Sequence, residues 1–312
     1  MDTFREQLAA LADAQSGGPS VTILSDLDRA HSKELRRDWP GLPAAARLRL
    51  VNEMAELGEE QIEYNFSRAL RVALRDEDAQ VRARAIEGLW EDDGEDFLAY
   101  LLDDAPRDPS AAVRTSAVRA LSRFSVLAVE EEIGPQWFDR LRDHLVALVR
   151  EGESGEVQRR ALEALAVYSD DREVEGLIDA AYASSDPAVR MSALYAMGRN
   201  LSRRWFDTIL AEIDSPVAGL RYEAVRASGA FGDRRAVPRL VERLGDDDRE
   251  VQLAAIGSLG QIGGSASMTI LKRLASSGDD IVREAAEEAL DEAAFMSNPL
   301  GPSGRLSGED WG

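Results

Sequence analysis

The side chains that carry most enzyme chemistry are scarce in this sequence. It contains no cysteine, and His31 and His144 are its only histidines. The lack of cysteine excludes disulfides, thiol catalysis, zinc fingers and iron–sulfur clusters. Two histidines are too few for a histidine-rich metal site, and they leave only two candidates for the histidine of a Ser-His-Asp triad. We therefore expect no catalytic residue, no bound metal and no cofactor.

The charged residues indicate which partners the chain can accept. Acidic residues number 58 and basic residues 37, so the net charge is −21, and Lys33 and Lys272 are the only lysines. A charge of this sign repels nucleic-acid backbones and anionic lipid surfaces. We expect another protein or a peptide as the partner, no membrane partner, and no general binding of nucleic acid. The composition says nothing of the oligomeric state.

An internal repeat organises the chain. Each copy begins with an apolar residue, has alanine four residues later, and usually has leucine four residues after that. The spacing of 0, +4 and +8 is that of one face of an α-helix. The small alanine lets a neighbouring helix approach closely. The seven copies begin at Val81, Val113, Val157, Val189, Leu220, Val251 and Val282.

Each copy predicts the second helix of a pair. Aspartate stands three residues before the start in four copies, at Asp78, Asp186, Asp248 and Asp279, where a carboxylate can cap a helix. Another amphipathic stretch precedes each copy, as at 137–149 and 236–244. No segment shows the alternation of a strand. The pattern predicts an all-α chain of about seven to eight antiparallel helix pairs.

These residues resemble HEAT-repeat proteins of the short HEAT-like subclass found in phycobilisome, or bilin, lyases. The segment 231–264 matches that consensus through Gly-Asp, Ala-Val-Pro-x-Leu, Asp-x-x-Val and Leu-Gly-x-Ile-Gly, and 186–198 matches it as well. The resemblance implies a right-handed α-solenoid, an α-α superhelix. It leaves the function open, because HEAT arrays serve as scaffolds, transport receptors, regulatory subunits and a few enzymes.

The ends of the chain differ from the repeats. We expect a short helix and flexible linker over 1–20, a degenerate capping helix pair over 21–60, the repeat array over 61–292, and a disordered tail over 293–312. The interval of 44 residues between Val113 and Val157 predicts an insertion of about a dozen residues near 124–137. Insertions in repeat arrays lie in loops on an edge, and we expect the segment 128–137, which contains three consecutive glutamates, to be a solvated acidic loop.

Arginine directly follows the start in five copies, so its stem runs along the interface between helices. In Asp78/Arg82, Asp186/Arg190 and Asp279/Arg283 an aspartate stands four residues earlier, a spacing that favours ion pairs. The pattern predicts a structural ladder of Asp–Arg pairs that joins adjacent repeats. An anion-binding row is the alternative. The ladder residues are Asp78, Arg82, Arg114, Asp186, Arg190, Arg221, Asp279 and Arg283.

The resemblance also implies that the second helices line a concave side. Positions +2, +6 and +10 of each copy point away from the core of that helix. Tyrosine, methionine and leucine ringed by arginine are typical of a protein-interaction patch that prefers an acidic partner. In the alternative, the tyrosines pack on adjacent helices and the arginines pair with Glu163 and Glu223. The residues are Arg119, Arg123, Arg159, Met191, Tyr195, Arg199, Tyr222, Arg226 and Leu253.

We interpret the chain as a non-catalytic scaffold or adaptor that binds a protein or peptide in its concave groove. The N-terminal residues contain no apolar signal region, so a cytoplasmic location is expected. A bilin lyase-like or chaperone-lyase activity is the alternative that the resemblance implies. A HEAT-like nucleic-acid-binding enzyme is a third, which the net charge of −21 disfavours.

Overall fold

The computed structural model describes residues 3–13, 20–152 and 154–297, and every regular element within these ranges is a helix. The predicted linker and tail lie mostly outside them. The last helix, α17 (Asp280–Ser297), extends into the segment in which a disordered tail was expected from residue 293. The chain divides into two compact units, Met1–Ala164 (unit 1) and Leu165–Gly312 (unit 2).

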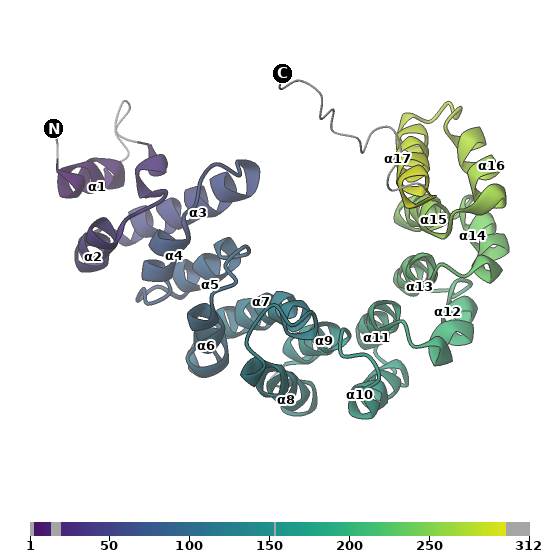
Figure 1. Cartoon of the computed structure of the whole chain (residues 1–312), viewed down its shortest axis with the longest axis horizontal. Coiled ribbons are helices and arrows are strands. Elements are labelled where there is room, and N and C mark those ends of the chain that lie inside the picture. Colours follow the sequence, from purple (N-terminus) through teal and green to yellow (C-terminus); the bar gives the residue numbers. More distant parts are fainter. Residues whose placement is uncertain (1–2, 14–19, 153, 298–312) are drawn as a thin grey trace, which may run out of the picture. The chain divides into compact units, whose positions relative to one another are not determined.

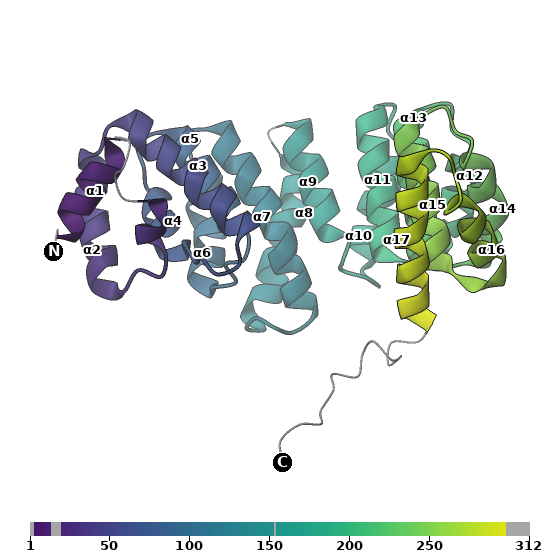
Figure 2. The same cartoon turned by 90° about the horizontal axis from the view of Figure 1, so that it is seen from above.

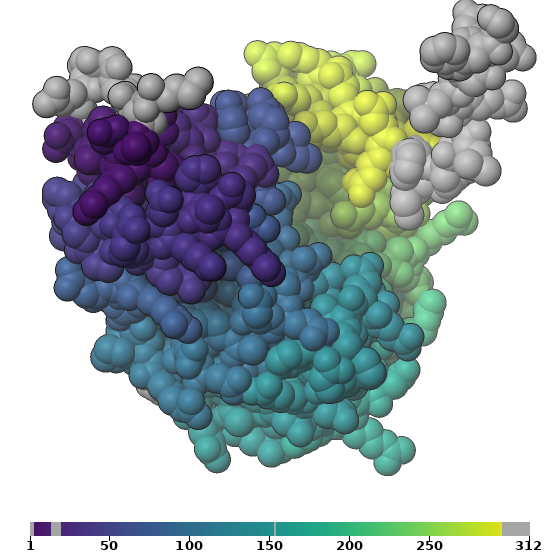
Figure 3. Space-filling model, turned by 60° about the vertical axis from the view of Figure 1, so that its left-hand side comes forward, coloured from purple at the N-terminus to yellow at the C-terminus, as the bar shows by residue number. Residues whose placement is uncertain are grey.

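Unit 1 is a stack of helix pairs in which first and second helices form separate layers (Figure 1). In the space-filling view, the purple and blue surface of unit 1 continues from one helix to the next (Figure 3). Short 3-10 turns supplement the α-helices. The helices are α1 (Phe4–Ala12), α2 (Arg29–Asp38), α3 (Ala44–Glu60), α4 (Ser67–Ala73), α5 (Ala79–Gly88), α6 (Glu95–Asp103), α7 (Ala111–Val129), α8 (Gln136–Glu151) and α9 (Gly155–Leu165).

Unit 2 repeats the same arrangement, so the fold is an all-α solenoid of helix pairs. Its second helices, α11, α13, α15 and α17, pack side by side in chain order and run parallel to one another (Figure 2). The helices that precede α17 are α10 (Arg172–Tyr182), α11 (Pro187–Asn200), α12 (Phe206–Glu212), α13 (Ala218–Phe231), α14 (Val237–Arg243), α15 (Arg249–Ile262) and α16 (Gly264–Leu274).

Aspartate caps start the second helices as the sequence predicts. The Asp78 carboxylate accepts a hydrogen bond from the backbone N–H of Gln80 at 2.8 Å, and Asp186 accepts one from Ala188 at 2.8 Å. Asp248 and Asp279 each accept two such bonds. These bonds satisfy N–H groups that have no partner within the helix, and the negative charge complements the helix dipole.

Small residues set how closely the second helices of unit 2 approach. Gly198, Gly229 and Gly260 each stand nine residues after the start of their copy. A Cβ atom built on Gly198 would lie 2.8 Å from the Cβ of Ala227, and one on Gly260 would lie 2.9 Å from the Cβ of Ala289. A Cβ on Gly229 would meet Ser258 in the same way. Each helix therefore packs on the next in one repeated register.

The predicted insertion is only partly a loop. Helix α7 continues without a break through Phe124 to Val129, and the segment 130–135 connects it to α8. Phe124 and Ala128 are buried. The expectation of a loop was therefore wrong for residues 124–129, because the apolar residues there extend the buried face of the helix by more than a turn.

The arginines at the ladder positions do not pair with the aspartates expected. Arg82 forms two hydrogen bonds to the Asp108 carboxylate, at 2.7 and 2.8 Å, and Asp78 is occupied as a helix cap. Arg190 contacts Glu212 at 2.5 Å, 22 residues further on. The i,i+4 pairing fails because an aspartate three residues before the start directs its oxygens at the first helical N–H groups.

The pairing that the structure uses joins successive repeats. An arginine at +1 reaches the aspartate that stands five residues before the next start, as in Arg82–Asp108 and Arg221–Asp246. The same guanidinium also donates to a carbonyl in the turn before its own helix, Asp76 O for Arg82 and Ser215 O for Arg221. Each such arginine therefore links the turns of two repeats.

The two remaining arginines of this set bind the turn of their own repeat. Arg114 donates to Asp108 O, and Arg283 donates to Ser277 O at 3.3 Å. Asp279, besides capping α17, pairs with Arg249 at 2.7 Å.

Asp246 gives the ladder a dependence on pH. Its hydrogen bonds with Arg221 lower the pKa of the carboxyl group below the ordinary value of 3.8. The folded chain therefore favours the carboxylate more than the unfolded chain does. This contribution is complete above about pH 4 and is lost as the pH falls through the lowered pKa.

We expect Asp246→Asn to reduce the free energy of unfolding by about 1 kcal/mol at pH 7 and by less below pH 4. Urea unfolding at a series of pH values measures this difference. The exposed neighbour Asp247 provides the control, because Asp247→Asn should change neither value. A difference between wild type and Asp246→Asn that is the same at pH 7 and pH 3 would contradict the prediction.

Among the described helices, none combines the length and apolar character needed to cross a membrane.

Candidate binding groove

A groove of about 490 Å³ crosses the second helices of unit 2. Helices α11, α13 and α15 form it, and most of its lining residues occupy positions +2, +6 and +10 of their copies. The repeated register of these helices places the three sets of positions in line. Five of the nine residues predicted to bind a partner line this groove: Tyr195, Arg199, Tyr222, Arg226 and Leu253.

The groove combines apolar side chains with unpaired positive charge. Tyr195, Tyr222 and Leu253 are half-buried, so part of each side chain meets solvent. Arg226 is exposed, and its guanidinium carbon lies 5.6 Å from the centre of the Tyr222 ring. Neither Arg226 nor the exposed Arg199 has a carboxylate partner in the described part of the chain. Both guanidinium groups are therefore available to an outside ligand.

Met191 lies beside this groove. It is half-buried on α11, and its sulfur occupies the space where a Cβ on Gly219 would lie, so it packs against the start of α13.

The three remaining predicted residues belong to unit 1. Arg119 pairs with Glu156 at 2.6 Å, and Arg123 donates to the Trp90 carbonyl. Arg159 is half-buried on α9. Periodicity found the face of each helix, but it did not show which arginines already have a partner within the fold.

Some residues that line the groove are not among those predicted to bind a partner. Ser258 and Gln261 contribute polar groups, and Gly198 with Ala227 form the floor where α11 meets α13. The glycine nine residues after the start, present in three consecutive copies, was the signal for this close approach.

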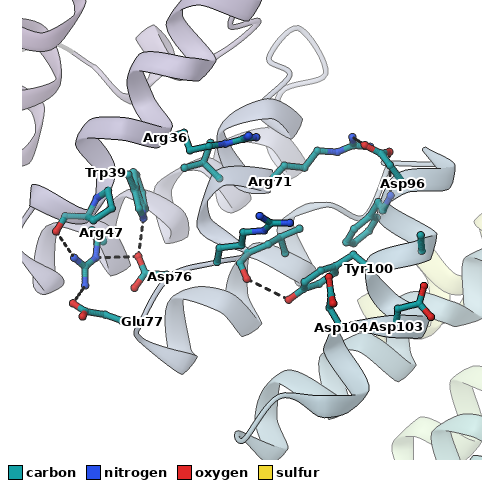
Figure 4. Close-up of a pocket in the computed structure, with 16 residues that line it drawn as sticks. Arg36, Trp39, Arg47, Arg71, Asp76, Glu77, Asp96, Tyr100, Asp103 and Asp104 are labelled. Carbon is teal, nitrogen blue, oxygen red and sulfur yellow. Dashed lines mark hydrogen bonds and ion pairs between the residues drawn. The ribbon is translucent and has the colours of Figure 1, made fainter.

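A second pocket, of about 630 Å³, lies in unit 1 among α2, α4 and α6 (Figure 4). Two charged side chains of this pocket are almost fully buried, Arg47 and Asp76, and they contact each other at 2.9 Å. Arg47 also contacts Glu77 at 2.6 Å. Trp39 donates to Asp76 at 2.7 Å. Ala46, Leu50 and Met54 keep the 0, +4, +8 spacing and form a degenerate first copy. Arg47 directly follows its start, so it holds the +1 ladder position of that copy.

The perturbed titratable groups of unit 1 reflect packing. Burial raises the pKa of Tyr100 to about 12, with the Asp108 charge adding to the effect, and its hydroxyl donates to Leu74 O. Burial lowers the pKa of His144, which lines a small cavity of about 190 Å³ with mostly apolar neighbours. No group of three or more potential metal ligands is found among the described residues.

Comparison with known proteins identifies the repeat. Residues 67–132 and 206–291 match the family of HEAT repeats. Each of the two units thus contains a segment that matches HEAT repeats, and the resemblance found in the sequence is confirmed. No curated protein shows a significant sequence match to the chain.

Several solved structures are similar to this chain at low sequence identity. The complex of CpcE and CpcF of phycocyanin lyase from Nostoc sp. PCC7120 is 18% identical, with a TM-score of 0.51 over 74% of this chain and 92% of that chain. Human deoxyhypusine hydroxylase is 20% identical, with a TM-score of 0.38 over 85% and 96%. Kap121p is 16% identical, with a TM-score of 0.47 over 97% and 40%. The first of these likenesses shows a common fold.

Proposed function

We propose that the chain is a non-catalytic interaction module whose unit 2 groove binds a segment of another protein. The observation that carries this proposal is the groove on the second helices α11, α13 and α15. Its half-buried apolar side chains stand beside two arginines that have no carboxylate partner among the described residues. Tyr195, Tyr222 and Leu253 supply surface that a partner can desolvate, and Arg199 and Arg226 supply charge at its rim. Tyrosine and arginine are the residues that most often dominate binding energy at protein interfaces.

The bound segment has acidic character in this proposal. The chain as a whole carries a charge of −21, whereas α11 and α13 present two guanidinium groups to the groove without carboxylate partners in the described residues. The carboxylates that line the groove are Glu223, which already interacts within the protein, and the exposed Glu250 on α15. This local charge attracts an acidic segment and raises the rate of encounter. A HEAT-repeat fold also hosts lyases and hydroxylases, so the proposal rests on the groove residues and not on the fold.

Affinity capture from the native lysate tests the groove. We expect the double substitution Tyr195→Ala, Arg226→Glu to reduce recovery of the specific partner by about tenfold or more, because it removes an anchor and reverses a charge. Arg273→Glu, on the first-helix layer at α16, should leave recovery unchanged. Equal recovery with wild type and the double variant would remove this groove as the binding site.

A further inference from the structure

The face that forms the groove continues onto the last described helix. The contact between Gly260 and Ala289 repeats the contact between Gly198 and Ala227, one helix further on. Helix α17 therefore packs on α15 in the same register as α13 packs on α11. Positions +2, +6 and +10 of α17 consequently follow in line after the groove positions of α15.

The charges along this extended face are segregated. Arg199 and Arg226 stand on α11 and α13. On α17 the three equivalent positions hold glutamate, and each is exposed without a cationic partner in the described residues: Glu284, Glu288 and Glu292.

The helix between these charges is mainly neutral on this face. The corresponding positions of α15 hold Leu253, Gly257 and Gln261. The exposed Glu250 also lies on α15 and adds to the negative side, whereas Glu223 on α13 already interacts within the protein. The face is positive at α11 and α13, has Leu253 as its apolar contact at α15 with Glu250 beside it, and is negative at α17.

We propose that this face binds an extended polypeptide segment with separated charges: acidic residues over α11 and α13, an apolar centre over α15, and basic residues over α17. The proposal rests on the proposed function and specifies its ligand. A uniformly acidic segment would meet three glutamates at α17, and like charges across an interface disfavour a partner. A segment with both charges in the matching order would be attracted at each end.

The spacing of the helices sets the length of the segment. Packed helices lie about 8–10 Å apart, so α13 and α17 are separated by about 16–20 Å. An extended chain rises about 3.3 Å per residue, so about five or six residues separate the acidic and basic groups of the ligand.

A random 12-residue peptide library displayed on phage, selected on the full chain, provides the test. Peptides that bind wild type but not the groove variant Tyr222→Ala, Leu253→Ala define the groove ligands. We expect them to carry acidic and basic residues at opposite ends with an apolar centre. Uniformly acidic peptides, or peptides with intermixed charges, would overturn the proposed charge order while the proposed function stands.

Charge reversal on α17 then tests the assignment of the ends. We expect the double variant Glu284→Lys, Glu288→Lys to bind a selected synthetic peptide with about tenfold lower affinity than wild type does. Replacement of the basic residues of the peptide by glutamate should restore the affinity for this variant. The control Glu242→Lys, on the first helix α14, should change neither affinity. Unchanged affinity after the α17 reversal would overturn the inference. If no groove-dependent peptide is selected, the proposed function itself fails.

Discussion

Replacement of Arg47 by alanine should lower the free energy of unfolding of unit 1 by about 3–5 kcal/mol. The side chains of Arg47 and Asp76 are only 3% and 1% exposed, so the substitution leaves a buried carboxylate without its counter-ion. Arg47 also donates to the carbonyls of Pro40 and Leu42, and these acceptors would lose a charged donor. Removal of one partner of a buried pair costs more than the pair itself contributes, because the other charge remains desolvated.

Urea unfolding followed by tryptophan fluorescence measures this loss. Arg36 lines the same pocket, is exposed and has no partner among the described residues, so Arg36→Ala should change stability by less than about 0.5 kcal/mol. The double variant Arg47→Met, Asp76→Leu should recover part of the stability, because it removes both charges. A loss below about 1 kcal/mol for Arg47→Ala would show that Asp76 is satisfied by other groups.

Two glycines of α15 should respond to the same substitution with opposite signs. A Cβ on Gly260 would lie 2.7 Å from the carbonyl oxygen of Ala289, whereas one on Gly257 would meet nothing within 4 Å. We expect Gly260→Ala to lower the free energy of unfolding by about 1–3 kcal/mol, because α17 must move away from α15. Gly257→Ala should raise it by about 0.5–1 kcal/mol, because alanine favours the helix more than glycine does.

Chemical denaturation of both variants gives the comparison directly. Because the two substitutions add the same methyl group to the same helix, their intrinsic helix propensities cancel, and the difference reports the contact with Ala289. Two variants of equal stability would show that the helix contact tolerates a methyl group and that the register does not depend on glycine. The same register places the α17 glutamates in line with the groove, so equal stability of the two variants would also remove the support for that placement.

The helices could be predicted from the sequence because one residue pattern states both their period and their starts. The valine and alanine at 0 and +4 mark a buried face, and aspartates such as Asp78 and Asp248 cap the helices that follow them. The ladder partners could not be found in this way. The bond from Arg82 to Asp108 joins residues 26 positions apart, and only the arrangement of two turns brings them together.

For the candidate site, too, the exposed face of each helix could be predicted, but the partners of the residues on it could not. Helical periodicity selects the residues that face away from the core, and Tyr222, Arg226 and Leu253 accordingly line one groove. Periodicity carries no information on what a neighbouring helix offers, so it did not show that Arg119 meets Glu156. The division into two units falls within the copy that begins at Val157, which follows the 44-residue interval and lacks both arginine at +1 and aspartate five residues before its start.

The arginine that links the turns of two repeats affects how repeats can be added to such a chain during evolution. The stretch from one start to the next can hold the donor near its beginning and the acceptor near its end, as Arg221 and Asp246 do in 220–250. A duplicated stretch of 31 residues, the commonest interval between copies, would arrive with both halves of this bond already encoded. Tandem duplication within the gene can therefore lengthen the protein without orphaning a charge at either new junction.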